Sequence, residues 1–337
     1  MDSMRHTEVE DDSQPAQEGL IFACELDGSG GCRDIPWQEV RAWKPGDALT
    51  WAHLDYQHET AASFLMSDAG LASFTAAALV AEDGRPREVR EGQGIHIRLR
   101  GANLNPGATP DDMVAIRMWI EPGRILTTRH RKMHPSREVY EDLKRGQGPT
   151  TEGGLLTSLI GKMSLHIAEV VDNIDDLVDS LEDQILTEES HALRPQISEI
   201  RRQIIRMRRY LAPQREVLSG LQMEQVPWIL DADRVHLREW NDRNLRYIED
   251  LDSARERTVV AGEELSSKLA EQLNRNMYLL AIVAGIFLPL GLFTGLLGIN
   301  VGGLPGVESP FAFWIVCGLL LILAACMVHI FRRFKIM

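Results

Sequence analysis

A row of small and polar residues follows one side of a long, mostly apolar segment towards the carboxyl end of the chain. At alternating steps of four and three residues, the row runs through Glu256, Val260, Glu263, Ser267, Ala270, Asn274, Met277, Ala281, Ala284, Leu288, Gly291, Gly295 and Gly298. These steps match the a and d positions of a heptad, but a packed helical seam would need Leu and Ile there. Helices around a narrow, water-filled path would tolerate acids and amides at one end and glycines at the other. The row therefore predicts a pore lining, and its candidates are Glu263, Asn274, Met277, Ala281, Ala284, Leu288, Gly291 and Gly295.

The same glycines allow a second interpretation. Gly291 and Gly295 have the spacing at which membrane helices pack closely against one another, so the row alone leaves open whether it faces water or a neighbouring helix. Pro289 lies in the same segment and removes one backbone donor. It is either a hinge or a tolerated kink.

Other side chains that bind metals are scattered. Cys326 and His329 are three residues apart on the last apolar segment, so they share a helical face, and both types bind zinc. Two ligands alone do not make a site, and helix packing is the simpler interpretation. Glu308 is the sole charged residue between Gly298 and Pro310. A ring of such acids would concentrate cations at an entrance; simple solvation is the equal alternative.

Enzymatic chemistry is not indicated. The sequence has no phosphate loop, nucleophile elbow or H-E-x-x-H motif. Its cysteines lack paired C-x-x-C spacing, so neither a disulfide framework nor a zinc ribbon is predicted. The cysteines are Cys24, Cys32, Cys317 and Cys326.

Two uncharged runs must hold the row in place. Residues 277–297 contain no charged side chain, and residues 311–331 contain only His329 besides cysteine as an ionisable group. At about 1.5 Å per residue, each run forms a helix of roughly 31 Å, which matches a hydrocarbon core of about 30 Å. Basic residues flank these runs on one side only, whereas the loop 298–310 has no Lys or Arg. The positive-inside rule therefore places both termini in the cytoplasm, including the basic tail 332–337.

The rest of the chain predicts a large cytoplasmic part. After a disordered tail, residues 1–18, the region 19–230 combines strands with helices. Period-two alternation predicts strands at 95–100 and 114–120, and 59–80 is expected to be helical. A stalk helix, 231–297, continues into the first apolar run. The predicted fold class is thus an α/β cytoplasmic domain followed by a long stalk helix and two transmembrane helices.

Two helices between these regions carry opposite charge. An amphipathic helix from about Gly153 has an acidic outer face, and a second helix from Pro195 through Tyr210 is rich in arginine. We expect them to form a hairpin. Their charges either neutralise one another, or the acidic face attracts cations near a pore mouth.

The loop that ends the row carries a family resemblance. Gly298-Ile299-Asn300, at the end of the first apolar run, resembles the Gly-x-Asn motif of the CorA-type transporters of divalent cations. The magnesium branch has Gly-Met-Asn, whereas Ile299 and the following Val-Gly-Gly-Leu-Pro-Gly resemble the zinc-transporting branch. Two further segments agree with the resemblance, which covers the chain from about residue 19 to the end. They are Arg100-Gly-Ala-Asn-Leu-Asn-Pro-Gly107, leading to Asp111-Asp-Met-Val114, and Arg208-Arg-Tyr-Leu-Ala-Pro-Gln-Arg-Glu-Val-Leu218.

The resemblance implies a CorA-like homopentameric funnel in a bacterial inner membrane, with the first span lining the pore. Asn300 would form a ring at the outer mouth and hold the metal through its hydration water. Amide oxygens accept hydrogen bonds from that water without the tight grip of a carboxylate ring, and conduction needs binding weak enough to release the ion. Zn²⁺ or another divalent cation is the expected cargo, with no cofactor and no nucleic-acid partner.

Proton-coupled zinc uptake is the implied activity, although efflux stays open. One alternative is a magnesium or cobalt channel. The other is a metal sensor or scaffold that uses the two spans as an anchor.

Overall fold

The computed structural model describes residues 18–82, 84–187, 192–298 and 309–333. These residues divide into two compact units: the first extends to Gly262, and the second begins at Glu263. The predicted tail, 1–18, lies almost wholly outside the described residues.

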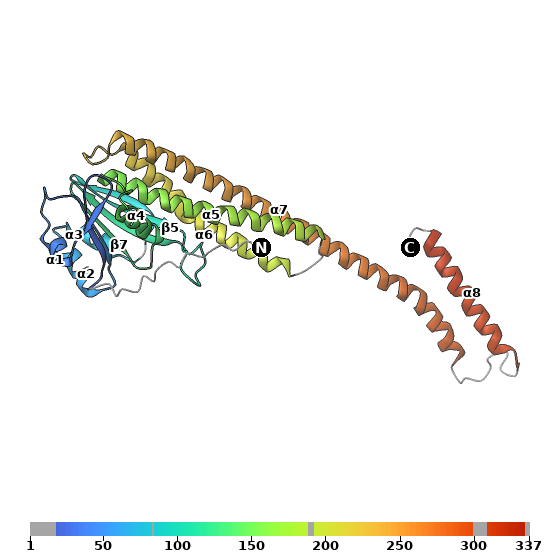
Figure 1. Ribbon diagram of the computed structural model, residues 1–337. Helices are drawn as coiled ribbons and strands as arrows, with labels where there is room; N and C mark the ends of the chain where they lie inside the picture. The colour runs from blue at the N-terminus through green and yellow to red at the C-terminus, as the bar shows by residue number, and fades with distance from the viewer. Residues whose placement is uncertain (1–17, 83, 188–191, 299–308, 334–337) are drawn as a thin grey trace, which may run out of the picture. The chain divides into compact units, whose positions relative to one another are not determined.

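A seven-stranded sheet organises the first unit (Figure 1). Its strand order is β2-β1-β3-β7-β6-β5-β4, and neighbours are antiparallel except for the parallel pair β3 and β7. The predicted strands at 95–100 and 114–120 are confirmed as β5 and β6. The strands are β1 (Leu20–Leu26), β2 (Cys32–Asp34), β3 (Thr50–Asp55), β4 (Arg87–Glu91), β5 (Gly94–Gly101), β6 (Val114–Glu121) and β7 (Arg124–Arg129).

The two edge strands are short and charged. On β2, Arg33 Nη2 lies 3.2 Å from Glu25 Oε2 and 2.9 Å from Glu39 Oε2. On β4, four of the five residues are Arg or Glu. The central strands are instead almost fully buried, because helices cover both faces of the sheet.

Short helices cover one face. Trp37, Phe64 and Leu79 pack there in one buried cluster with Leu126 of β7. The helix expected over 59–80 is broken, because Gly70 adopts a φ of 66° that favours glycine and ends the first part. The elements on this face are α1 (Trp37–Ala42), α2 (Glu59–Ser63), the π-helical turn η1 (Phe64–Asp68) and α3 (Ser73–Val80).

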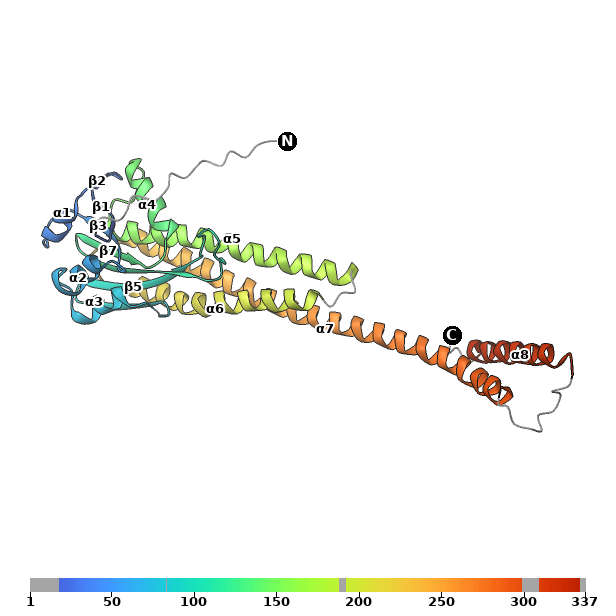
Figure 2. The same cartoon turned by 90° about the horizontal axis from the view of Figure 1, so that it is seen from below.

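Long helices cover the other face, where α5, α6 and the first part of α7 run side by side (Figures 1 and 2). Leu159 of α5 and Leu218 of α6 join Leu99 of β5 in the main buried cluster. The amphipathic helix expected from Gly153 is confirmed as α5, and the basic helix extends beyond Tyr210. The bounds are α4 (His134–Lys144), α5 (Glu152–Thr187), α6 (Leu193–Met223) and α7 (Asp231–Leu297).

Of the two alternatives for the charges of α5 and α6, mutual neutralisation is wrong for the described residues. The acids of α5 meet Arg257 of α7, whose Nη1 lies 2.8 Å from Asp175 Oδ1 and whose Nη2 lies 2.6 Å from Glu182 Oε2. Arg257 also pairs with Asp179. These carboxylates raise the pKa of Arg257. The physical reason is that α5 and α6 both turn their apolar stripes into the shared core, so their charged faces point elsewhere.

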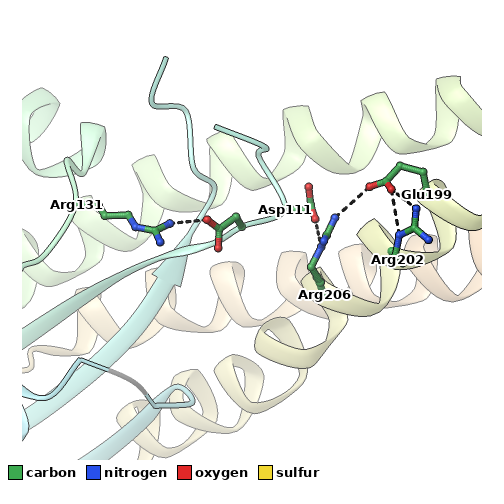
Figure 3. A network of polar contacts seen from close by, with 6 residues as sticks. Asp111, Arg131, Glu199, Arg202 and Arg206 are labelled. Atoms are coloured by element: carbon green, nitrogen blue, oxygen red, sulfur yellow. Dashed lines mark hydrogen bonds and ion pairs between the residues drawn. The ribbon is translucent and has the colours of Figure 1, made fainter. Parts of the chain in front are cut away.

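The arginines of α6 instead hold the segment between β5 and β6. Arg206 lies between Asp111, which is 2% exposed, and Glu199 of its own helix (Figure 3). Arg202 pairs with the same Glu199, and Arg131 pairs with Asp112 at 2.5 Å. The segment between β5 and β6, which carries part of the family resemblance, is thus held to α6 by the ion pair between the buried Asp111 carboxylate and Arg206.

Candidate functional site

The outer part of α7 is covered on one face by α8 (Ala312–Arg333) within the second unit. Ile282 is only 7% exposed, and Gly285, Ile286 and Pro289, which follow it at helical spacing, are half-buried. At Gly285 the contact is close: a Cβ there would lie 2.9 Å from Cζ of Phe331 on α8. Ile282, Gly285, Ile286 and Pro289 therefore form the covered face of α7.

The predicted pore-lining residues occupy another face, and each of them is exposed. Met277 is 67% and Leu288 is 72% exposed. A Cβ built on Gly291 or Gly295 meets no atom within 4 Å. Within the described chain, these two glycines are not helix-packing contacts. The uncovered face of α7 comprises Glu263, Asn274, Met277, Ala281, Ala284, Leu288, Gly291 and Gly295.

The two faces lie on different sides of the helix. At 3.6 residues per turn, the mean directions of the covered and uncovered faces differ by roughly 120°. The same division holds in the first unit, where Thr258 is buried and its carbonyl accepts a hydrogen bond of 2.8 Å from Arg201 of α6. Glu256 and Val260, on the opposite side of that part of α7, are exposed. The small and polar row is therefore exposed in the described chain from Glu256 to Gly295.

Pro289 belongs to the covered face rather than to the row of small residues. Because proline has no N–H, the carbonyl of Gly285 loses its helical donor. Gly285, which contacts Phe331, thus also has a backbone carbonyl without its helical hydrogen-bond donor. The position favours a bend at the contact between α7 and α8, and it is compatible with either a hinge or a fixed kink.

The loop motif is described only at its first residue. The N–H of Gly298 donates to the carbonyls of Thr294 at 3.0 Å and of Gly295 at 3.2 Å, which closes the helix. Ile299, Asn300 and Glu308 lie outside the described residues, so their roles remain sequence-based predictions.

Tight metal ligands are not gathered anywhere in the part of the chain that the structure describes: it contains no group of three or more His, Cys, Asp or Glu side chains that could hold an ion. Cys326 and His329 are exposed on α8. The oxygen and amide groups on the uncovered face of α7, at Glu263 and Asn274, are separated along the helix.

Sequence reasoning missed the contact between Gly285 and Phe331, although a signal exists. Ile282, Gly285, Ile286 and Pro289 are spaced at i, i+3, i+4 and i+7, which marks one side of a helix. In an apolar span every side is hydrophobic, so this spacing does not stand out from the sequence.

The fold and this site define an integral membrane transport protein with a large α/β domain. A family model described as CorA-like Mg²⁺ transporter protein matches residues 46–333, and the chain belongs to that family. It is a family of ion transporters rather than of enzymes.

Relatives at higher identity cover almost the whole chain. The zinc transport protein ZntB of Yersinia enterocolitica is 38% identical over 303 residues, which cover 90% of this chain and 91% of the relative. The divalent cation transporter CmaX of Pseudomonas aeruginosa is 36% identical over 323 residues, covering 95% and 97%. The solved structure of full-length CmaX superposes with a TM-score of 0.82 at 35% identity, covering 96% of this chain and 99% of that one.

Proposed function

We propose that this chain is a zinc transporter whose pore is lined by α7. Five copies would surround the path in a bacterial inner membrane, with both termini in the cytoplasm and zinc moving inwards together with protons. The proposal rests on one observation above all: the small and polar residues of α7 are exposed on a side other than the one that meets α8, and a Cβ at Gly291 or Gly295 would meet no atom of the described chain within 4 Å.

The chemistry of the uncovered face supports passage of a hydrated dication. Asn274 offers an amide, Glu263 offers a carboxylate, and the glycines leave room for water. Neither uncharged run contains an Asp, Glu, Lys or Arg that would trap or repel the ion. Asn300 would complete this face with a ring of amide oxygens at the outer mouth, where they accept hydrogen bonds from the water shell.

Zinc is favoured as the cargo by the relatives and by the loop. The zinc transport protein of Yersinia enterocolitica aligns over most of the chain, and Ile299 replaces the Met of the magnesium branch. A magnesium or cobalt channel is the second candidate, because the matching family model is described as a CorA-like Mg²⁺ transporter protein. Competition between Zn²⁺ and Mg²⁺ in one flux assay decides between them: excess Mg²⁺ that abolishes zinc flux favours the second candidate.

The central experiment is radioactive zinc flux into liposomes that contain the purified protein. We expect Asn300→Ala to reduce flux by roughly tenfold, which corresponds to about 1.4 kcal/mol at the barrier. Unchanged flux in Asn300→Ala would remove the amide ring from the mechanism. Zinc flux that is absent in the wild-type protein would instead favour a membrane-anchored sensor or scaffold.

A matched pair on α7 tests the pore face itself. Asn274 lies on the uncovered face, whereas Asn276 is turned by about 200° from it at 3.6 residues per turn. Asn274→Leu is expected to lower zinc flux, and Asn276→Leu to leave it near the wild-type value. Equal losses in both variants would contradict the assigned face.

Direction and proton coupling need a separate arm of the same assay. An inside-negative potential of about 100 mV favours inward movement of a dication by about 4.6 kcal/mol. With zinc and potential held fixed, an inward proton gradient is expected to increase uptake. Zinc flux that does not change with the proton gradient would contradict proton coupling but not zinc transport.

A further inference from the structure

Two cysteines outside the transport path lie side by side at an edge of the sheet. In the register of β1 and β2, Cys24 opposes Asp34 and Leu26 opposes Cys32. The cysteines are therefore diagonal neighbours on one face, and both contact the main buried cluster. Both are free thiols.

We propose that Cys24 and Cys32 form a reversible thiol–disulfide modification site whose oxidation acts on helix α4. The oxidant is a small disulfide such as oxidised glutathione. The Cys32 thiolate attacks one sulfur of that disulfide, forms a mixed disulfide and releases one small thiolate. Cys24 then loses its proton, attacks the Cys32 sulfur and releases the second small thiolate. The protein loses two hydrogen atoms, and one oxidised small disulfide becomes two thiols.

The two sulfurs have different environments, which assigns their roles. Cys24 is fully buried, whereas Cys32 is half-exposed on the edge strand, so an incoming disulfide reaches Cys32 first. The neighbouring Cys24 thiol lowers the pKa of Cys32 against the effect of burial, and the ammonium of Lys144 lowers it further. Both effects favour Cys32 as the attacking sulfur and Cys24 as the resolving one.

Bond formation requires a small movement of β2. Diagonal neighbours across antiparallel strands are about 7–8 Å apart, whereas the Cα atoms of a disulfide lie within about 7 Å. A shift of roughly 1 Å closes the gap. β2 has three residues and pairs with β1 alone in the sheet, so this shift disturbs few backbone hydrogen bonds.

The shift reaches α4 through Asp34, two residues beyond Cys32. The carboxylate of Asp34 accepts hydrogen bonds from Tyr140 Oη at 2.7 Å and from Lys144 Nζ at 2.8 Å, both on α4. α4 in turn contacts α5: Oε1 of Glu138 on α4 lies 2.9 Å from Nε2 of His166 on α5. Moving β2 therefore loosens the contacts that hold α4.

The reaction should be slow at neutral pH. Burial raises the pKa of both thiols, with a further rise at Cys24 from Cys32 and Asp34. Asp27 and Asp34 disfavour the Cys32 thiolate, while Lys144 favours it. Since the thiolate is the attacking form, the rate is expected to rise about tenfold for each pH unit.

The test exposes the detergent-purified full chain to oxidised glutathione. Mass spectrometry after cleavage at acidic residues detects the linkage, since Glu25 and Asp27 lie between the two cysteines. We expect a linked Cys24–Cys32 peptide that dithiothreitol removes. Cys24→Ser, or Cys24→Ala where serine disturbs folding, should accumulate the mixed disulfide on Cys32. Replacing Cys317 and Cys326 by Ser is the matched control, and it should leave the linkage unchanged.

Hydrogen exchange of the oxidised protein tests the effect on α4, and faster exchange there is expected. A wild-type protein that stops at the mixed disulfide on Cys32, or that forms no adduct at pH 8, overturns the site. A linked peptide with unchanged exchange in α4 overturns the connection to that helix. Neither outcome depends on the cargo of the transporter.

Discussion

Helix α5 differs from the outer part of α7 and from α8 both in apolar content and in surroundings: the mean hydropathy of the most apolar stretch is 1.3 in α5, 2.3 in α7 and 2.5 in α8. All three helices are long and apolar enough to cross a membrane. In the most apolar stretch of α5, 61% of the residues are buried inside the protein, against 6% in α7 and none in α8. α5 also carries an acidic face along its apolar stripe, whereas α8 has no charged residue before Arg332. The lower apolar content of α5 and the charges on its outer face, rather than its length, separate this core helix from the two membrane helices.

The largest effect on stability is expected from introducing one arginine into the buried stripe of α5 and, separately, one into the exposed surface of α8. Leu159 of α5 is fully buried and Ile322 of α8 is 72% exposed. Leu159→Arg buries an unpaired charge and should lower the free energy of unfolding of the first unit by several kcal/mol. Ile322→Arg should spare that unit and disfavour membrane insertion by about 3 kcal/mol.

Thermal unfolding followed by circular dichroism, together with alkaline extraction of membranes, measures the two effects separately. Val316, which is half-buried on α8, provides a position for a neutral control, Val316→Leu. If Leu159→Arg left the melting temperature unchanged, α5 would not be a core helix.

A smaller effect is expected at the contact between α7 and α8. In Gly285→Ala the new Cβ would lie 2.9 Å from Cζ of Phe331, so the Phe331 ring must turn or the helices must separate, at a cost of up to about 1–3 kcal/mol. We expect lower thermal stability in detergent and reduced zinc flux, and Phe331→Leu in the same chain should restore both. Gly318→Ala on α8 is the matched control, because its Cβ would meet no atom within 4 Å. A Gly285→Ala protein as stable and active as that control would show that this contact does not orient α7.

The smallest effect concerns the contact between α4 and α5. The hydrogen bond with Glu138 raises the pKa of His166. Burial opposes ionisation of Glu138, but His166 and Lys162 lower its pKa overall. The contribution of His166 is therefore complete below its unfolded pKa of about 6.5 and is lost as pH rises through the raised folded value. The contribution of Glu138 is lost in the other direction, as pH falls through its lowered pKa.

Denaturant unfolding of the wild-type protein and His166→Gln at about pH 6 and pH 9 measures this pair. The wild-type advantage should be about 1 kcal/mol at the lower pH and should vanish at the higher one. An advantage that grows with pH would contradict the assignment.

Regular patterns made part of the fold predictable. The alternation in β5 and β6, the amphipathic stripe of α5 and the start of α7 at Asp231 all follow from the sequence. β7 was missed because it lies between β3 and β6, is covered on both faces and so lacks alternation. β4 was missed because its Arg and Glu residues are atypical of strands.

The sequence predicts which residues of α7 form the candidate site, but it does not predict which side of α7 meets α8. The row from Glu263 to Gly295 follows from spacing, yet its exposure depends on which side of α7 meets α8. That side is set by the close contact of Gly285 with Phe331, residues 46 positions apart in the sequence. The spacing of Ile282, Gly285, Ile286 and Pro289 marks one side of α7, but it does not identify Phe331 as the partner. Asn300 and Glu308 lie outside the described residues, so their placement stays a prediction.

The charged edge strands of the sheet have a consequence for how copies of this protein meet. A bare strand edge is a template on which another chain can extend the sheet, and uncontrolled extension ends in fibrous aggregates. At β2, Arg33 is already committed to Glu25 and Glu39, and at β4 an incoming strand would have to strip water from Arg and Glu side chains. Pairing between the sheet edges of neighbouring copies is therefore disfavoured. Contacts between copies would instead have to form through the helices.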